Sequence, residues 1–165
     1  MKASIVGLAR RAVSRSPMEE VRVAVLTPDV GVLGDCKGRK FPERQVTILA
    51  QEDWDAALMD LAGPAGPPHL PWTTRRANVL VQGLNLPRGI GSIIALGDCL
   101  VQVTDQTTPC AQMELAYPGL LRALAPDWRG GVTCKVLTGG GICLGDTVSV
   151  LRHTAEKQKV LLPGE

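Results

Sequence analysis

The sequence predicts a mainly β fold in which short strands form a barrel or a sandwich. Short segments rich in Val, Ile and Leu recur along most of the chain, and Gly, Pro or charged residues separate them. Several of these segments alternate apolar and polar residues, as in Leu100–Thr104, which is the period of a half-buried strand. The 18 Gly and 12 Pro are too frequent for a bundle of long helices.

Eight segments are expected to be strands because each combines aliphatic residues with turn-forming residues at its ends. In chain order they are Ser4–Ala9, Val21–Leu26, Gln45–Leu49, Asn78–Val81, Ser92–Leu96, Leu100–Thr104, Val132–Leu137 and Thr147–Leu151. No shift in composition separates them, so we expect a single domain over residues 1–165.

Two regions are expected to be helical. Glu52–Leu61 places apolar residues at helical spacing and ends before a Gly-Pro pair. Cys110–Leu124 is the second region, interrupted at Pro118. The segment between the first helix and the next strand, Gly63–Pro71, contains four prolines and is expected to be an irregular loop.

Composition and charge argue against several classes of protein. A net charge of +2 and an aromatic content of 3% argue against a nucleic-acid partner. No apolar run approaches the roughly 18 residues that span a bilayer, so no membrane association is expected. The five cysteines cannot all pair and show no C-x-x-C spacing, which predicts free thiols in a reducing, cytoplasmic setting.

Cys110 is the thiol with the strongest functional indication. It follows Thr107-Thr108-Pro109, where a threonine is expected to cap a helix that starts near the proline. The positive end of that helix would favour the nucleophilic or metal-binding thiolate. A buried or idle thiol is an equally good reading of Cys110 from the residues alone. Cys36 lies among cations and is the second candidate, whereas Cys99, Cys134 and Cys143 adjoin apolar strands and are expected in the core.

Two polar segments could bind an anion. Leu-Gly-Asp occurs three times, and only its first copy, ending at Asp35, leads into a cationic segment that contains Lys37. Arg44 follows in the same segment. Arg75-Arg76 lies just before Asn78, and guanidinium groups beside an amide suit bidentate recognition of a phosphate. The adjacent arginines are expected to point to opposite sides, so one of them should be a surface residue.

Read in order, the short motifs of this chain resemble those of the MOSC domain family, named for the C-terminal part of molybdenum cofactor sulfurases. The resemblance covers nearly the whole chain and suggests a small stand-alone member of a bacterial type. The motifs are Ser16-Pro17-Met18, Gly34-Asp35, Arg44-Gln45-Val46-Thr47, Arg75-Arg76-Ala77-Asn78 with Gly83, Gly97-Asp98, Val103-Thr104, Thr108-Pro109-Cys110, Arg129-Gly130-Gly131-Val132 and Gly145-Asp146.

The resemblance implies a closed, mostly antiparallel β-barrel with a site at Cys110, which in relatives carries sulfur as a persulfide or coordinates the molybdenum of a pterin cofactor. Cofactor-binding relatives such as the amidoxime-reducing proteins reduce N-hydroxylated compounds. By similarity, Asp35 would lie near the metal and take part in catalysis. The cofactor and its phosphate would be held by residues of the matching motifs and of the cationic segment: Arg75 or Arg76, Asn78, Thr108, Lys37 and Arg44.

One departure from the family affects the Gly34-Asp35 loop, because many relatives have His where this chain has Lys37. Larger members also carry a pyridoxal-phosphate desulfurase domain, which this chain is too short to include. A separate cysteine desulfurase or electron donor is therefore the expected partner, together with a small-molecule substrate.

Two other classes of function remain open from the sequence. A non-enzymatic barrel that binds RNA or a protein is one, since small barrels are often binding modules. A thiol redox sensor that uses Cys110 and Cys36 is the other.

Overall fold

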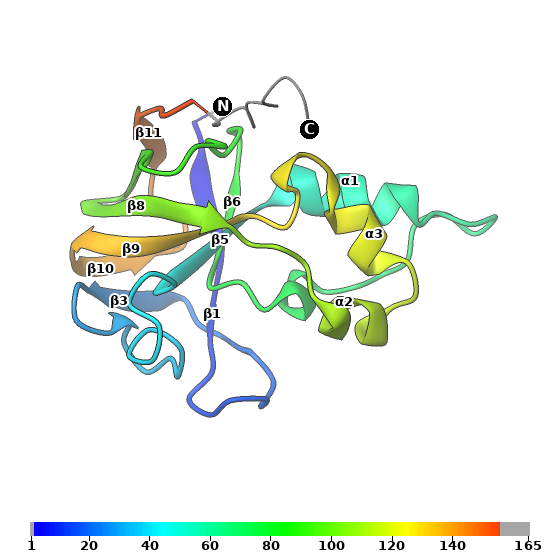
Figure 1. Ribbon diagram of the computed structural model, residues 1–165, viewed down its shortest axis with the longest axis horizontal. Coiled ribbons are helices and arrows are strands. Elements are labelled where there is room, and N and C mark those ends of the chain that lie inside the picture. The colour runs from blue at the N-terminus through cyan, green and yellow to red at the C-terminus, as the bar shows by residue number, and fades with distance from the viewer. Residues whose placement is uncertain (1, 156–165) are drawn as a thin grey trace, which may run out of the picture.

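The computed structural model describes residues 2–155, and in it two β-sheets enclose one core while a group of helices packs on the outside of the larger sheet (Figure 1). The larger sheet has eight strands in the order β11-β7-β8-β9-β5-β6-β1-β2, and the smaller has three in the order β10-β3-β4. All pairs are antiparallel except β5 with β6.

The eight strands expected from the sequence are all present, with ends shifted by a few residues. They are β1 (Ser4–Arg10), β3 (Val23–Thr27), β5 (Val46–Ala50), β6 (Val79–Gln82), β7 (Ile93–Leu96), β8 (Cys99–Gln106), β9 (Val132–Thr138) and β11 (Val148–Arg152). Three short strands were not expected: β2 (Glu19–Glu20), β4 (Gly31–Val32) and β10 (Gly140–Cys143).

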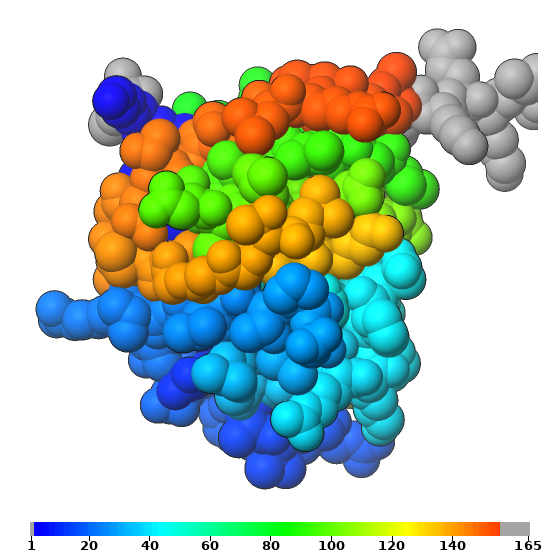
Figure 2. All heavy atoms as spheres, turned by 90° about the vertical axis from the view of Figure 1, so that its left-hand side faces the viewer, coloured from blue at the N-terminus to red at the C-terminus, as the bar shows by residue number. Residues whose placement is uncertain are grey.

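The expected closed barrel is wrong, because the two sheets do not join into one continuous ladder. The large sheet comes closest to closing where the start of β1 meets the segment that leads into β11. An isolated bridge joins Ser4 and Thr147 there, with adjoining backbone hydrogen bonds such as Val148 N–H to the Ala3 carbonyl at 3.0 Å, but β11 and β1 do not form a ladder. The chain leaves the large sheet after β9 at Gly139 and pairs with β3 instead. A Cβ on Gly139 would lie 2.4 Å from the Leu26 carbonyl oxygen, so only glycine allows this change of sheet. Figure 2 shows β9 and β10 in orange bordering β3 in blue.

The helical regions are also confirmed. The first is α1 (Gln51–Asp60), and the second divides at Pro118 into α2 (Ala111–Ala116) and α3 (Leu120–Leu124). Short 3₁₀ turns cover Trp72–Arg75 and Pro126–Trp128. Within residues 2–155, no helix has the length and apolar character needed to cross a bilayer.

Two apolar clusters hold these layers together. The first fills the space between the sheets and includes Ile48, Ile94 and Val101. The second lies between the large sheet and the helices, where Trp54 of α1 is almost fully buried. α1 and α3 lie side by side over this second cluster (Figure 1). The packing fixes the point at which the chain leaves β8 and enters α2, and Cys110 lies in that connection.

Candidate functional site

The Cys110 side chain is exposed on the rim of a cavity of about 540 Å³. The cavity lies where β8 leaves the large sheet. Because the Cys110 side chain is exposed, its sulfur is not the buried, inert thiol that the sequence left open. The volume of the cavity falls within the roughly 300–1,000 Å³ typical of ligand pockets. The lining consists of Glu43, Arg44, Thr104, Asp105, Gln106, Thr108, Pro109, Cys110 and Thr133.

The helix after Cys110 begins later than expected. Cys110 itself is the residue before α2, with extended backbone angles of −116° and 176°, and no side chain caps the helix there. The expected cap by Thr107 or Thr108 with a first helical residue near Pro109 is therefore wrong. Thr107 is buried and its hydroxyl has no hydrogen-bond partner in the described structure. Cys110 is thus held by its place between β8 and α2 rather than inside a helical turn.

Arg75 holds the backbone that leads into Cys110. Its side chain donates from Nε to the Gly130 carbonyl at 3.1 Å and from Nη2 to the Thr107 carbonyl at 2.8 Å. Only 5% of Arg75 is exposed. Burial lowers the pKa of Arg75 to about 10, against an opposing effect of the nearby Cys110 sulfur. A cation buried in this way stabilises negative charge on a neighbouring group.

Gly130 makes this contact possible. A Cβ at Gly130 would lie 2.3 Å from the Thr107 carbonyl oxygen and 3.1 Å from the Arg75 side chain. Glycine allows two backbone segments to approach this closely. Here the close approach is between two backbone segments, and it fixes the position of Arg75.

Lys37 and Asp35 lie in one loop, and neither belongs to the lining of the Cys110 cavity. The two Asp35 carboxylate oxygens accept the backbone N–H groups of Arg11 at 2.9 Å and Lys37 at 3.2 Å. The Lys37 ammonium donates to the Thr47 hydroxyl at 2.7 Å. Burial lowers the pKa of Lys37 to about 8; Asp35 opposes this shift, whereas Arg44, Arg11 and Arg75 add to it.

The four cations Arg11, Lys37, Arg44 and Arg75 therefore form a group, which we call the cationic cluster. Within residues 2–155, no charged side-chain nitrogen of these four residues lies within 4.0 Å of a carboxylate oxygen; the ion pairs found there join Arg88 to Asp127 and Arg129 to Asp60. Arg11 also has a buried Nη1 without a partner among the described atoms. Positive charge at this position exceeds what the surrounding protein groups neutralise, as in an anion-binding site.

Two of the predicted phosphate-binding residues have other surroundings. Arg76 adopts left-handed backbone angles, with φ of 66°, and points away from Arg75 to a shallow depression lined also by Arg15 and Thr73. Arg75 is thus the arginine at the site. Asn78 is 2% exposed, accepts the Thr47 N–H at 3.0 Å and donates to the Ala9 carbonyl at 3.2 Å. Its amide joins β1, β5 and the start of β6.

The remaining cysteines lie apart from the cavity lining. Cys99 and Cys134 are buried in the core as expected, and burial raises the pKa of both thiols. The expectation of a core position is wrong for Cys143, which is exposed and donates from its sulfur to Asp146 at 3.1 Å. Cys36 is partly buried. Residues 2–155 contain no cluster of three or more His, Cys, Asp or Glu side chains that could hold a metal, so Cys110 would be a lone protein ligand.

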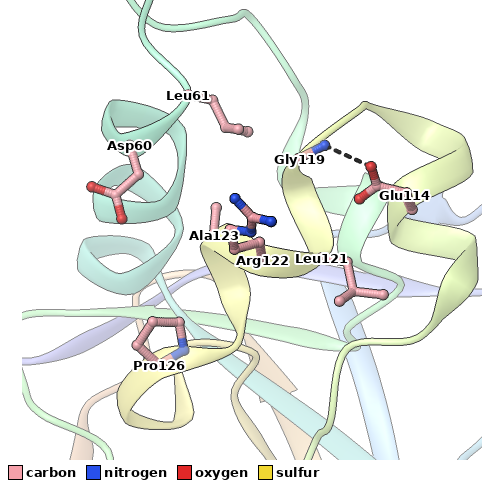
Figure 3. A pocket seen from close by; sticks show the side chains of 8 residues that line it. All are labelled: Asp60, Leu61, Glu114, Gly119, Leu121, Arg122, Ala123 and Pro126. Carbon is pink, nitrogen blue, oxygen red and sulfur yellow. Dashed lines mark hydrogen bonds between the residues drawn. The ribbon is translucent and has the colours of Figure 1, made fainter.

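A larger cavity, of about 770 Å³, lies between α1 and the α2–α3 pair and contains none of the predicted site residues (Figure 3). The Arg122 side chain points into its opening. Glu114 at its edge accepts the Gly119 N–H at 2.9 Å, which closes the turn between α2 and α3. We therefore place the candidate site at Cys110.

Sequence reasoning missed the wall contributed by β8. A β-bulge between Val103 and Asp105 interrupts the alternation of that strand, so that Thr104, Asp105 and Gln106 all line the cavity. The sequence carried a signal for this irregularity. The apolar–polar alternation of Leu100–Thr104 stops at a run of polar residues, although nothing in the run shows which way each would point. Glu43 and Thr133 had no such signal.

Comparison with known proteins agrees with this architecture. The MOSC domain family matches residues 33–149, which include the Asp35 loop, Arg75 and Cys110. This chain belongs to the MOSC domain family. The YuaD protein from Bacillus subtilis has a similar fold, with a TM-score of 0.75 at 18% identity over 93% of this chain and 98% of that one.

Two further relatives extend the comparison. YiiM from Escherichia coli gives a TM-score of 0.63 at 15% identity, over 92% of this chain and 71% of YiiM. A protein of Gibberella moniliformis named "Reductase" is 36% identical over 75 residues, which are 44% of this chain. That match spans only 13% of the reductase, so the two proteins share one segment.

Proposed function

We propose that this MOSC protein binds molybdenum cofactor in the Cys110 cavity and reduces small N-hydroxylated compounds. The observation that carries the proposal is the exposed Cys110 sulfur on a cavity wall that it shares with Arg44, backed by the buried Arg75. The family's association with this cofactor and the partial match to a protein named reductase support it.

The residues at the cavity fit such a cofactor in three respects. A thiolate is a soft ligand, which suits a molybdenum ion better than oxygen ligands alone. No charged group of the cationic cluster forms an ion pair among the described residues, so the cluster suits a phosphate. Thr133 lines the cavity, is 2% exposed and has a hydroxyl without a partner in the described structure, so a polar ligand would satisfy it.

Each residue would have a distinct role. Cys110 would bind the metal, and Arg44, Lys37 and Arg75 would neutralise the phosphate, with the Thr108 hydroxyl at the cavity edge as a further polar contact. Asp35 would act as a positioning residue rather than a catalytic one, because both carboxylate oxygens hold backbone N–H groups of the loop that presents Lys37. Molybdenum, when bound, supplies the two-electron redox chemistry.

The overall reaction sets what else must arrive at the site. Reduction of an N-hydroxylated compound breaks its N–O bond, consumes two electrons and two protons, and releases water. Cys110 is the only cysteine of the cavity lining, so a dithiol within it is not a source of those electrons. We propose that a separate electron-donor protein supplies them, and that the reaction takes place in the cytoplasm.

Sulfur carriage is the second candidate function, and the same observation favours it. An exposed thiol beside a buried arginine could also accept sulfur from a cysteine desulfurase and hold it as a persulfide. This alternative needs Cys110 but no bound pterin. The two functions therefore differ in what is found on the purified protein.

The test is the molybdenum and pterin content of protein made in cells that synthesise the cofactor. Wild type should contain both, and Cys110→Ser should lose molybdenum. Cys143→Ser is the matched control, because Cys143 is also exposed but lies outside the cavity. Equal molybdenum in wild type and Cys110→Ser would contradict the proposal. A Cys110 persulfide on wild type that lacks molybdenum would favour sulfur carriage.

A further inference from the structure

A row of polar residues crosses three strands beside Cys110. Thr47 of β5 pairs with Thr133 of β9, and Thr133 pairs with Asp105 of β8. Directly paired residues on antiparallel strands project from the same face of a sheet. Two strand spacings separate the ends of the row by about 10 Å. The Lys37 ammonium contacts the Thr47 end, so the row is positive at one end and negative at the other.

The bulge in β8 sets the negative end. Asp105 lines the cavity and is exposed, and one of its carboxylate oxygens accepts the Gln106 N–H at 2.7 Å. Glu43 is the other carboxylate of the lining, and Arg44 is its one cation. Thr104 is fixed between these groups, because its hydroxyl contacts the carbonyl oxygens of Glu43 and Thr133.

Thr133 gives a second and independent indication of a ligand. It is more than nine-tenths buried, it lies between the two ends of the row, and its hydroxyl has no partner among the described residues. An unpaired buried hydroxyl is costly in a folded protein. A ligand group that both donates and accepts hydrogen bonds would satisfy Thr133 and Asp105 together.

Charge decides which ligand suits the negative end. A phosphate bound by Arg44, close enough to feel the charges of Lys37 and Arg75, would neutralise the positive end of the site. Asp105 and Glu43 would then be the uncompensated charges of the cavity wall. A substrate with its own carboxylate would meet repulsion there, whereas a nitrogen group rich in N–H donors would form charge-assisted hydrogen bonds.

We propose that Asp105 is a specificity-determining residue which, with the Thr133 hydroxyl, selects substrates whose reacting carbon–nitrogen group is cationic or rich in N–H donors. This inference rests on the proposed function, since it names the substrate class of the same site. It predicts that the protein discriminates against carboxylate analogues of equal shape.

The test uses benzamidine and benzoate, which are planar, similar in shape and opposite in charge. Each is titrated into ¹⁵N-labelled protein in phosphate buffer, so that inorganic phosphate supplies the anion and binding does not depend on cofactor loading. Benzamidine should shift the amide signals of residues 104–108 and 110 and bind at least about tenfold more tightly than benzoate. Asp105→Asn should weaken benzamidine roughly tenfold, the loss of one charge-assisted hydrogen bond.

Two controls separate recognition from folding. Asp98→Asn changes an exposed aspartate outside the cavity lining and should bind benzamidine as wild type does. Thr133→Ser should keep binding, and Thr133→Val should weaken it. Equal affinity for benzoate, unchanged affinity in Asp105→Asn, or shifts confined to other parts of the protein would overturn the inference. Molybdenum content, measured separately, reports on the proposed function alone.

Discussion

Replacement of Lys37 by methionine should stabilise this protein at neutral pH, although it removes a residue of the site. Burial and three neighbouring arginines lower the pKa of Lys37 from 10.5 to about 8. One pKa unit corresponds to about 1.4 kcal/mol, so the charged ammonium costs the folded state about 3 kcal/mol. The variant also loses the hydrogen bond to Thr47, which lowers its stability by about 1 kcal/mol. The expected net gain for Lys37→Met at pH 7 is about 2 kcal/mol.

The sign of the pH dependence follows from proton linkage. Between pH 8 and 10.5 the folded chain binds fewer protons at Lys37 than the unfolded chain does, so the stability of wild type rises with pH. The advantage of Lys37→Met should therefore shrink by about 3 kcal/mol across this window. Buried Cys134 has a raised pKa and acts in the opposite direction, but it is present in both proteins and cancels.

The assay is urea denaturation of both proteins at pH 7 and just above pH 10.5, with the free energy of unfolding extrapolated to water. Lys40→Met is the matched control, because Lys40 lies in the same loop but is exposed. A stability difference between wild type and Lys37→Met that is the same at both pH values would refute the reasoning. If the reasoning holds, the chain retains a destabilising charge where the proposed phosphate would need it.

Three further predictions concern the frame around the site. Asn78→Ala should lose about 2–3 kcal/mol of unfolding free energy in urea denaturation, because two buried hydrogen bonds disappear. An unchanged midpoint would contradict the view that its amide holds β1, β5 and β6 together. Gly130→Ala should lower the free energy of unfolding by about 1–3 kcal/mol and reduce the molybdenum content, because the new Cβ would meet the Thr107 carbonyl. Gly141→Ala is the control: a Cβ there has open space, and the variant should behave as wild type. Arg75→Lys keeps the charge but leaves a backbone carbonyl unpaired, so its melting temperature should fall below that of wild type. The melting temperature of Arg75→Ala, which loses the charge as well, should fall further.

Local patterns were sufficient for the strands and helices of this fold. Alternation over Leu100–Thr104 and the Gly-Pro stop after Leu61 both depend on neighbouring residues, and the structure confirms both. Closure of the sheet depends instead on where β10 pairs, and that is decided by contacts between distant segments. Gly139 permits the change of sheet, but the sequence does not distinguish this glycine from the other 17.

The site was predictable to the extent that its chemistry lies in short motifs. Cys110 and Arg75 became candidates because their residue types and motif spacing are informative. The structure places Cys110 at a cavity and Arg75 against the backbone that leads to it, while their roles stay predictions. The sequence could not show which of Arg75 and Arg76 faces the site, because the left-handed backbone at Arg76 is not predictable from the residues. Asp105 and Thr133 were missed because a bulge and a strand pairing bring them to the cavity, and both are tertiary features.

The central claim is that the Cys110 sulfur binds molybdenum, and X-ray absorption at the molybdenum edge tests it most directly. Wild type should show one more sulfur neighbour at the metal than Cys110→Ser loaded with the same cofactor, and Cys143→Ser should match wild type. An identical number of sulfur neighbours in wild type and Cys110→Ser would contradict the assignment.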